Sequence, residues 1–428
     1  MHIIFIHQVF ISPEEAGSTR HFELARHLVK KGHRVTIISS AVNYLTGKVN
    51  DRFKRKFLSK EIVEGVEIMR TWTYPGIHMN YIARFISFIS FMFSSILGGF
   101  HAGKIDAVIA CSPQIFTGVS GYVVSRVKRV PFIFEIRDLW PKFAIETRVL
   151  TNARLISLAG SLERWVYKRA DHFIINSPGF YEHLEGFNIP KERISLVSNG
   201  VDTKVFTPGE RYNPFREEMG LGKKFTVMYA GAHGRANGLD TVIEAAKILK
   251  GRSDIIFMMV GDGKEKDDLI RLSEGYGLKN VLFVGAQTKR KMPEICRSAD
   301  VCLAILQKRE AFKTVYPNKI FDYMASGRPT ILAIDGVARE VLEKSEGGIF
   351  VEPEDPDALA ETVLTLYNNR ELAERYGENA RKYVVENFDR EKIAEDLNDI
   401  LLKVAGNTIG CSASDRTAFG ESHENKKC

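Results

Sequence analysis

The sequence predicts an α/β protein with two Rossmann-like domains, each built on a doubly wound, mainly parallel sheet, that face each other across a cleft. Short apolar runs alternate with segments of helical length and spacing, and this alternation occurs twice, on either side of a turn-rich link at Asn199–Pro208. With 428 residues, 44% of them hydrophobic, the chain can form two or three full cores. Ligands of open parallel sheets bind beyond the carboxyl ends of the strands, so we expect the chemistry in the cleft.

The first series predicts an N-terminal domain over residues 1–205. Its strand candidates are Ile3–Val9, Val35–Ser39, Ala107–Cys111, Pro131–Ile136 and His172–Asn176, and its helix candidates are Thr19–Lys31, Thr117–Arg126 and Arg154–Lys168. The more polar segment Ile62–Tyr74 predicts a hairpin at the edge of the sheet.

The second series predicts a C-terminal domain over residues 206–386. Its strand candidates are Phe225–Gly231, Ile255–Gly261, Val281–Gly285, Val301–Leu306, Thr330–Ile334 and Ile349–Val351. The last helix candidates are Asp357–Asn368, Glu371–Asn387 and Arg390–Val404. We expect residues 387–405 to form a helix that returns to the N-terminal domain, and residues 406–428, which are polar with few large apolar side chains, to be disordered.

The composition predicts a cytosolic protein without a bound metal. The start Met1–Ile6 has neither the basic flank nor the cleavage site of a signal peptide and predicts a first strand. The five cysteines show no CxxC spacing, which favours reduced thiols over a zinc site. We find no zinc finger, RNA-recognition or helix-turn-helix pattern, and therefore expect no nucleic-acid partner.

Two stretches suggest contact with a membrane. The run Lys48–Lys60 holds six cations against one Asp, which is typical either of a solvated face or of a surface for anionic lipid. The stretch Ile82–Phe100 is nearly all apolar or small and approaches the ~20 residues that span a bilayer. A span would place Ala107–Cys111 across the membrane from the first strands, so we expect a buried or interfacial helix and a protein peripheral to the inner face of the plasma membrane.

The most informative stretch is Pro317–Pro329, which predicts a helix that starts at Pro317 and stops at Gly327. Ile320, Phe321 and Met324 form a stripe for burial, whereas Asn318 and Asp322 share another face. The helix leads into the apolar run Pro329–Ile334, so its N-terminus belongs at the rim of a sheet and could bind a phosphate. Asp322 would then face the hydroxyls of the group that carries this phosphate, although a solvated surface helix has the same pattern.

Several glycine-containing turns follow strand candidates and are compatible with phosphate or nucleotide binding, as well as with ordinary structural turns. Gly17 precedes the first helix, which Ser18 could simply cap. The stretch Phe225–Asp240 combines a strand, a glycine-rich turn and a helix start, and the turn brings Arg235 as a cation. The candidate binding residues of these turns are Gly17, Gly231, Gly234, Asn237, Gly261 and Gly285.

Acidic residues occur at two further places. Glu135-Ile-Arg-Asp138 ends a strand, where carboxylates are placed for chemistry, although Arg137 could neutralise one of them. Asp355-Pro-Asp357 has the DxD spelling used by metal-dependent transferases, but its position before a helical pattern favours an N-cap. The chain has no GxGxxG, P-loop or HExxH motif, which removes the main sequence support for nicotinamide chemistry and ATP hydrolysis.

These motifs together resemble family 4 of the retaining glycosyltransferases, which have the GT-B fold, over about residues 2–400. Phe321–Pro329 resembles the segment around the second acidic residue of the Glu-x7-Glu signature of this family. Arg20–Leu28 and Gly32–Thr36 resemble parts of the family's N-terminal domain. Arg137–Pro141 and Val315–Lys319 resemble the corresponding segments of its amino-sugar branch, which acts in surface-polysaccharide synthesis. The chain departs from the pattern at Thr314, where the first Glu should be, and at Asn237, where a Lys is usual.

The resemblance implies that a sugar is transferred with retention from a nucleoside diphosphate sugar, UDP-sugar favoured, to a lipid-linked saccharide held by the N-terminal domain, without a cofactor or metal. It assigns Asp322 to the ribose, Arg235 and Lys319 to the diphosphate and Asp138 to the acceptor hydroxyl. The loop of Gly17 would line the acceptor and diphosphate side of the cleft. It favours a hexosyl or N-acetylhexosaminyl transferase. A nucleotide-sugar 2-epimerase of the same architecture and a non-catalytic partner subunit remain alternatives.

Overall fold

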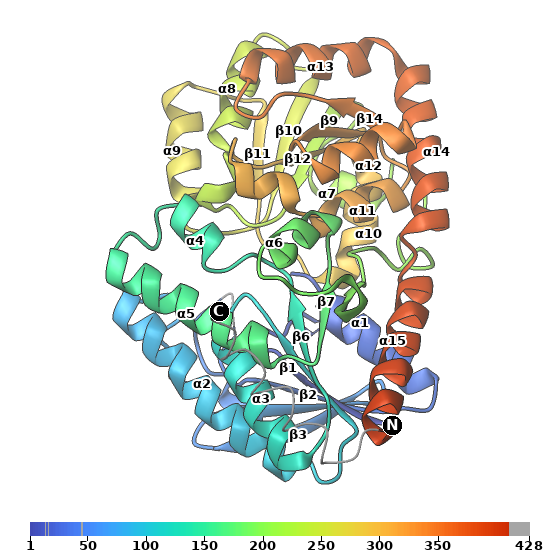
Figure 1. The fold of residues 1–428 in the computed structure, drawn as a ribbon. Helices are drawn as coiled ribbons and strands as arrows, with labels where there is room; N and C mark the ends of the chain where they lie inside the picture. Colours follow the sequence, from blue (N-terminus) through green and yellow to red (C-terminus); the bar gives the residue numbers. More distant parts are fainter. Residues whose placement is uncertain (13, 16, 44–45, 411–428) are drawn as a thin grey trace, which may run out of the picture.

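The computed structural model describes residues 1–410 except 13, 16, 44 and 45, with the backbone alone for 407–410. It contains an eight-stranded sheet in the order β3-β4-β2-β1-β5-β6-β7-β8 and a six-stranded sheet in the order β11-β10-β9-β12-β13-β14 (Figure 1). All neighbouring strands are parallel except β3 and β4. This topology confirms the predicted pair of Rossmann-like domains.

The first sheet and its helices are formed by the N-terminal half of the chain. The strands are β1 (His2–Ile6), β2 (Arg34–Ser40), β3 (Leu58–Val63), β4 (Val66–Thr71), β5 (Ala107–Cys111), β6 (Phe132–Ile136), β7 (His172–Ile175) and β8 (Ile194–Leu196). The helices are α1 (Arg20–Lys30), α2 (Tyr81–His101), α3 (Phe116–Lys128), α4 (Lys142–Glu146), α5 (Ala153–Arg169) and α6 (Tyr181–Glu185). The predicted hairpin is β3–β4 at the edge of the sheet, and it begins at Leu58 rather than Ile62.

The second sheet has the same construction. Its strands are β9 (Phe225–Ala230), β10 (Ile255–Val260), β11 (Val281–Val284), β12 (Val301–Ile305), β13 (Thr330–Ala333) and β14 (Gly348–Phe350). Its helices are α7 (Pro214–Glu218), α8 (Asp240–Ile248), α9 (Lys266–Gly275), α10 (Met292–Ser298), α11 (Asn318–Ala325), α12 (Val337–Ser345), α13 (Pro356–Asn368) and α14 (Arg370–Asn387). Alternate residues of a strand face opposite cores, as Val227 and Met228 do in β9.

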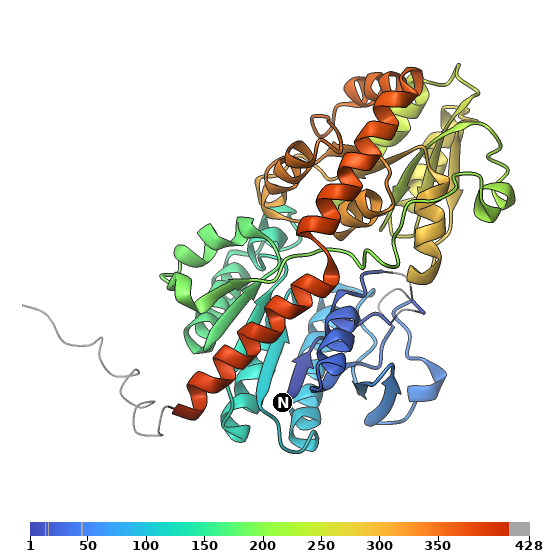
Figure 2. The same ribbon diagram turned by 90° about the vertical axis from the view of Figure 1, so that its right-hand side faces the viewer.

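The chain ends with α15 (Arg390–Gly410), which lies along the N-terminal domain after α14 has followed the C-terminal domain (Figure 2). Ile393, Ala394, Leu397 and Leu401 of α15 belong to the core that also contains α1. The helix runs past residue 406, where we expected a disordered tail to begin, and residues 411–428 of that predicted tail lie outside the described residues.

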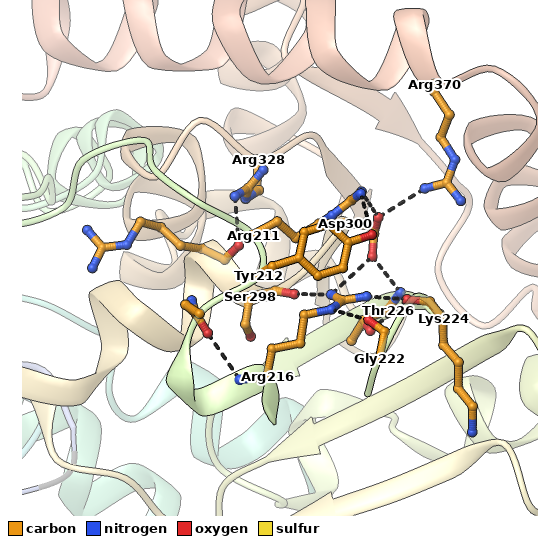
Figure 3. Close-up of polar contacts among 12 residues, drawn as sticks. Arg211, Tyr212, Arg216, Gly222, Lys224, Thr226, Ser298, Asp300, Arg328 and Arg370 are labelled. Atoms are coloured by element: carbon orange, nitrogen blue, oxygen red, sulfur yellow. Dashed lines mark hydrogen bonds and ion pairs between the residues drawn. The ribbon is translucent and has the colours of Figure 1, made fainter. Parts of the chain in front are cut away.

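A buried cluster of charged residues stabilises the second domain at the amino ends of its strands (Figure 3). Asp300, which precedes β12, accepts hydrogen bonds from Arg211, Arg216, Arg370 and the backbone N–H of Thr226. Its carboxylate thereby ties the segment before α7 and the start of α14 to the sheet. The cluster lies at the edge opposite the carboxyl ends of the strands, so we assign it a structural role.

Helix α2 is the one described helix that is long and apolar enough to cross a membrane. It connects β4 and β5, which belong to one sheet, and it packs on that sheet and on α3. A helix in this position cannot also span a bilayer. Its buried face is formed mainly by small residues such as Ser94, Ser95, Gly98 and Gly99, together with Phe91. Several other large apolar side chains of α2 are exposed, among them Ile82, Phe85 and Phe93.

Candidate active site

Helix α11 is held at the carboxyl edge of the second sheet as the sequence predicts. Pro317 is its N-cap, and Gly327 follows its end with a φ of +67°. Ile320, Phe321 and Met324 are buried in the core between the helix and the sheet. This packing fixes the direction in which the other face of α11 presents its polar side chains.

That other face is not open to solvent, in contrast to the simplest interpretation of the sequence. Asp322 is buried, and its Oδ2 lies 2.6 Å from Nζ of Lys289, which belongs to the single turn η5 (Lys289–Lys291) after β11. Burial raises the pKa of Asp322, and the Lys289 ammonium opposes that rise. Oδ1 of Asn318, one turn earlier, is buried without a hydrogen-bond partner among the described residues.

Lys319 meets the glycine-rich turn that follows β9. Its Nζ lies 4.0 Å from the centre of the Tyr229 ring, and a Cβ placed on Gly231 would come within 2.7 Å of the same Nζ. Burial lowers the pKa of Lys319 to about 7, since no described carboxylate forms an ion pair with it. The structure therefore brings Lys319 and Gly231 together, and it leaves a half-buried ammonium without an ion-pair partner among the described residues.

The turns after β9 and β10 pack against each other so closely that glycine is required. Gly231 and Gly261 have φ values of +155° and +145°, and a Cβ on Gly261 would lie 1.9 Å from the Gly231 carbonyl oxygen. Gly234 is the N-cap of the short turn η4 (Arg235–Asn237), in which the Arg235 side chain is exposed and has no partner among the described residues. Gly285 follows β11, and a Cβ there would meet open space.

His233 is a residue of this turn that we did not identify from the sequence. It is fully buried, and neither ring nitrogen has a hydrogen-bond partner among the described residues. Burial lowers its pKa to about 4, with a further contribution from Lys266, so the imidazole is neutral at pH 7. The only signal in the sequence was its place between two candidate glycines, Gly231 and Gly234.

At the carboxyl edge of the first sheet, Arg20 and His21 of α1 both bind Glu135 of β6. Burial would raise the pKa of Glu135, but these two partners lower it well below the usual range. Arg20 thus provides the main opposite charge for Glu135, whereas His21, whose own pKa burial lowers to about 4, is a neutral hydrogen-bond partner. Arg137, which the sequence suggested for this role, donates a hydrogen bond to Nε2 of His7 over 2.8 Å, and its charge also lowers the pKa of Glu135.

Asp138 follows this cluster and is only partly buried. No described residue donates a hydrogen bond to its carboxylate, and burial raises its pKa to about 6 although Arg137 opposes the shift. Gly17 lies in the loop before α1 with a φ of +130°, and a Cβ there would be 2.3 Å from Cδ1 of Ile11. The N-cap of α1 is Thr19, not Ser18, and Thr19 makes no side-chain cap bond.

Buried polar atoms without partners gather at this edge. They are Nδ1 of His7, Oε1 of Gln8, Nε of Arg20, Oε1 of Gln114 and Nε of Arg137, with partners counted among the described residues. Buried polar groups are normally hydrogen-bonded. Several unpaired polar atoms at the ends of β1, β5 and β6 therefore indicate a place where a polar ligand or water binds.

The two carboxyl edges touch directly. Ser177 after β7 donates a hydrogen bond to the carbonyl of Thr314, and Asn199 donates one to the carbonyl of Tyr316 over 2.6 Å. Thr314, which stands where the resemblance expects a glutamate, is thus part of the contact between the domains. The candidate residues from both sheets therefore lie around one interface.

The described residues do not offer a convincing metal site. His21, Cys111 and Glu135 could bring three ligand atoms within 4.8 Å of one another. Glu135 is already bound by Arg20 and His21, and burial raises the pKa of the Cys111 thiol well above its usual value. The Asp355 carboxylate of the DxD spelling accepts a hydrogen bond from the N–H of Ala358 over 2.9 Å, which confirms it as an N-cap.

Comparison with known proteins agrees with this architecture. A family model described as glycosyltransferase family 4 matches residues 17–205, and one described as glycosyl transferases group 1 matches residues 213–383. The chain is 23% identical over 411 residues to WcaI of Escherichia coli (strain K12), which is named as a glycosyl transferase of colanic acid biosynthesis, and the match covers 93% of this chain and 99% of WcaI. It is 24% identical over 252 residues to the O-antigen chain mannosyltransferase C of Escherichia coli, covering 58% of this chain and 64% of that protein.

Solved structures of low sequence identity show the same fold. Sucrose-phosphate synthase from Thermosynechococcus elongatus superposes with a TM-score of 0.75 at 18% identity and covers 95% of this chain and 99% of its own. Anabaena HepE in complex with UDP gives a TM-score of 0.70 at 17% identity and covers 94% of this chain and 100% of its own. With both halves matched by family models and the two sheets arranged in this way, the chain belongs to the group 1, family 4 glycosyltransferases of GT-B fold.

Proposed function

We propose that this glycosyltransferase takes its sugar from a nucleoside diphosphate sugar, with UDP as the favoured carrier. The observation that carries the proposal is the start of α11, where Lys319 places an ammonium beside the glycine turn at Gly231 and Asp322 follows about one turn later. A diphosphate at the turn and a ribose at the carboxylate match this spacing. The HepE structures, which contain UDP or UDP-glucose in a similar fold, support the same donor class.

In this proposal the protein stabilises the departing diphosphate by electrostatics alone. Lys319, Arg235 and the N-terminus of α11 would meet the growing negative charge on the phosphate oxygens as the bond to the sugar breaks. Asp138 would lie near the incoming hydroxyl from the other domain. With retention of configuration, the departing phosphate oxygen can itself accept the proton of that hydroxyl, so no metal and no second carboxylate is required.

The proposed acceptor is a lipid-linked saccharide of surface-polysaccharide synthesis, with a hexosyl or N-acetylhexosaminyl group as the transferred sugar. The support is the outer face of α2, where Ile82 is 72% exposed and Phe93 is 60% exposed. The basic run nearby is exposed as well, including Lys54, Arg55 and Lys56. An exposed apolar helix face and exposed clustered cations in the same domain suit the anionic, cytoplasmic face of a membrane, where the protein would bind peripherally.

The decisive experiment compares nucleotide binding and transfer in wild-type protein and Asp322→Asn. A panel of nucleotide sugars with mass detection of the released nucleotide identifies the donor, and an acceptor-dependent product distinguishes transfer from 2-epimerisation of the donor. Loss of the charged contact to the ribose should weaken UDP binding by ~1.5–3 kcal/mol. The melting temperature should also fall, because Lys289 is left without its counter-ion, so binding is measured well below that temperature. Wild-type affinity in Asp322→Asn would refute the ribose assignment. UDP binding without turnover on any donor would instead support the non-catalytic alternative.

A further inference from the structure

The ion pair between Lys289 and Asp322 joins the loop after β11 to the donor helix α11. Nζ of Lys289 lies 2.6 Å from Oδ2 of Asp322, and the two side chains are only 17% and 12% exposed. The same Nζ lies 4.5 Å from the centre of the Phe206 ring, a cation–π contact that holds the ammonium in place. The pair is therefore shielded from solvent and held on two sides.

Four charged groups from four elements face one another here. Besides Lys289 of η5 and Asp322 of α11, they are Glu23 of α1 and Arg390 of α15. Arg390 donates from Nε to Oε2 of Glu23 over 2.8 Å, so its charge is already matched within the N-terminal domain. No other described cation forms an ion pair with Asp322, which leaves Lys289 as its counter-ion.

We propose that Lys289 is a positioning residue for the donor, which keeps the Asp322 carboxylate ionised and oriented so that it can accept hydrogen bonds from the ribose. This inference rests on the proposed role of Asp322. Lys289 occupies Oδ2 and leaves Oδ1 for the ribose hydroxyls, and an ionised acceptor forms stronger hydrogen bonds than a protonated one. Without the ammonium, a buried carboxyl beside Glu23 would take up a proton and lose acceptor capacity.

Lys289 also connects the donor site to the other domain. Its backbone N–H donates to the carbonyl of Glu15, in the loop that contains Gly17, over 3.3 Å. The next residue, Arg290, forms an exposed ion pair of 2.7 Å with Glu14 of the same loop. Arg290 thus shares the contact between the domains but not the contact to Asp322, which makes Arg290→Met a matched control for Lys289→Met.

The test measures UDP affinity by calorimetry from about pH 6 to pH 9 for wild type, Lys289→Met, Lys289→Arg and Arg290→Met. Relative to wild type at the same pH, Lys289→Met should bind UDP weakly at low pH and recover as the pH rises, because Asp322 then ionises without help. Each unit by which its apparent pKa rises should weaken binding about tenfold below that pKa. Lys289→Arg and Arg290→Met should follow the wild-type profile.

Two results would overturn the inference. A wild-type profile in Lys289→Met would show that Asp322 does not need this counter-ion, and an equal loss at every pH would show that Lys289 acts only through packing. Asp322→Asn, measured in parallel, separates the two proposals. If it binds UDP normally, the ribose assignment itself fails, whereas weak binding in Asp322→Asn with normal Lys289→Met refutes only the role of Lys289.

Discussion

Lys319 illustrates how a single half-buried side chain can be prepared for a phosphate. Its ammonium is set beside Gly231 without a carboxylate partner among the described residues, and burial lowers its pKa to about 7. A bound diphosphate would stabilise the charged form and raise that pKa again. The cost of desolvating the ammonium is therefore recovered only when an anion binds.

The lowered pKa of Lys319 predicts that donor binding depends on pH. UDP affinity should fall as the pH rises above about 7, because the free protein then has to take up a proton at Lys319 before it binds, and the fall approaches about tenfold per pH unit. Lys319→Met should abolish this dependence and reduce turnover. Calorimetry across the pH range checks both, and an unchanged pH slope in Lys319→Met would refute the assignment.

The same substitution has an opposite consequence for stability. In the folded protein Lys319 has a lowered pKa of about 7, whereas an unfolded lysine titrates near its ordinary value, so the unfolded state binds more protons between these values. Burial of the charged Lys319 therefore lowers the free energy of unfolding by its full amount below about pH 7, and this destabilisation decreases as the pH rises. Lys319→Met should thus unfold at a higher temperature than wild type at pH 6, with a smaller difference at pH 9.

Some residues of the site were predictable from the sequence and others were not. The cap at Asp355 and the stripe of Ile320 and Phe321 follow from local spacing, which a sequence displays directly. The partnership of Lys289 with Asp322 depends on how a loop after one strand packs against a helix 33 positions later, and no local pattern encodes it. The burial of His233 likewise depends on the neighbouring turns at Gly261 and Gly263.

At the scale of elements, α2 has the reverse of the usual arrangement of a surface helix. Small residues, including Ser95, form most of the face toward the sheet and α3, where Phe91 is the large apolar side chain that is fully buried, while Ile82, Phe85 and Phe93 are exposed. A helix on a soluble surface normally buries its large apolar side chains. This outer face, in the same domain as the basic run Lys48–Lys60, is the surface that we propose for membrane contact.

Charged substitutions on this face test the idea. Ile86 and Phe93 are seven positions apart, lie on one side of α2 and are 45% and 60% exposed. Ile86→Asp with Phe93→Asp should abolish sedimentation with anionic liposomes while folding stability changes by less than about 0.5 kcal/mol per site. Val205→Asp with Ile248→Asp, at 49% and 48% exposure outside α2, is the matched control. Equal loss of sedimentation in both double variants would exclude α2 as the docking element.

The strands were predicted to within a few residues because buried parallel strands are continuous apolar runs. β8 (Ile194–Leu196) escaped notice because three residues are too few to form a pattern, and its order in the sheet depends on pairing with β7. The hairpin β3–β4 was placed correctly, but its start at Leu58 lies inside the basic run, whose charge conceals the alternation.

At the scale of the whole molecule, the chain passes between the domains twice, and the two passages lie side by side. Val201 of the first passage and Phe388 of the second are joined by a backbone hydrogen bond of 3.1 Å, and Arg390 N–H returns a bond to Val201 over 2.8 Å. Arg390 then begins α15, and its side chain binds Glu23 of α1. The last helix therefore completes the N-terminal domain (Figure 2).

This arrangement predicts that the N-terminal domain depends on α15 for its stability. Arg390→Met leaves Glu23 buried without its cation and should reduce the free energy of unfolding by about 3–5 kcal/mol, as the loss of one partner of a buried ion pair usually does. Lys31→Met removes a different pair in the same interface, with Glu395, whose side chains are 51% and 55% exposed, and should cost less than about 1 kcal/mol. Urea unfolding followed by fluorescence measures both. Because Arg390 is the counter-ion of Glu23, the double variant Arg390→Met with Glu23→Gln should recover part of the lost free energy of unfolding. If the double variant instead loses as much free energy as the two single variants together, the charge pair is not what holds α15 to the domain.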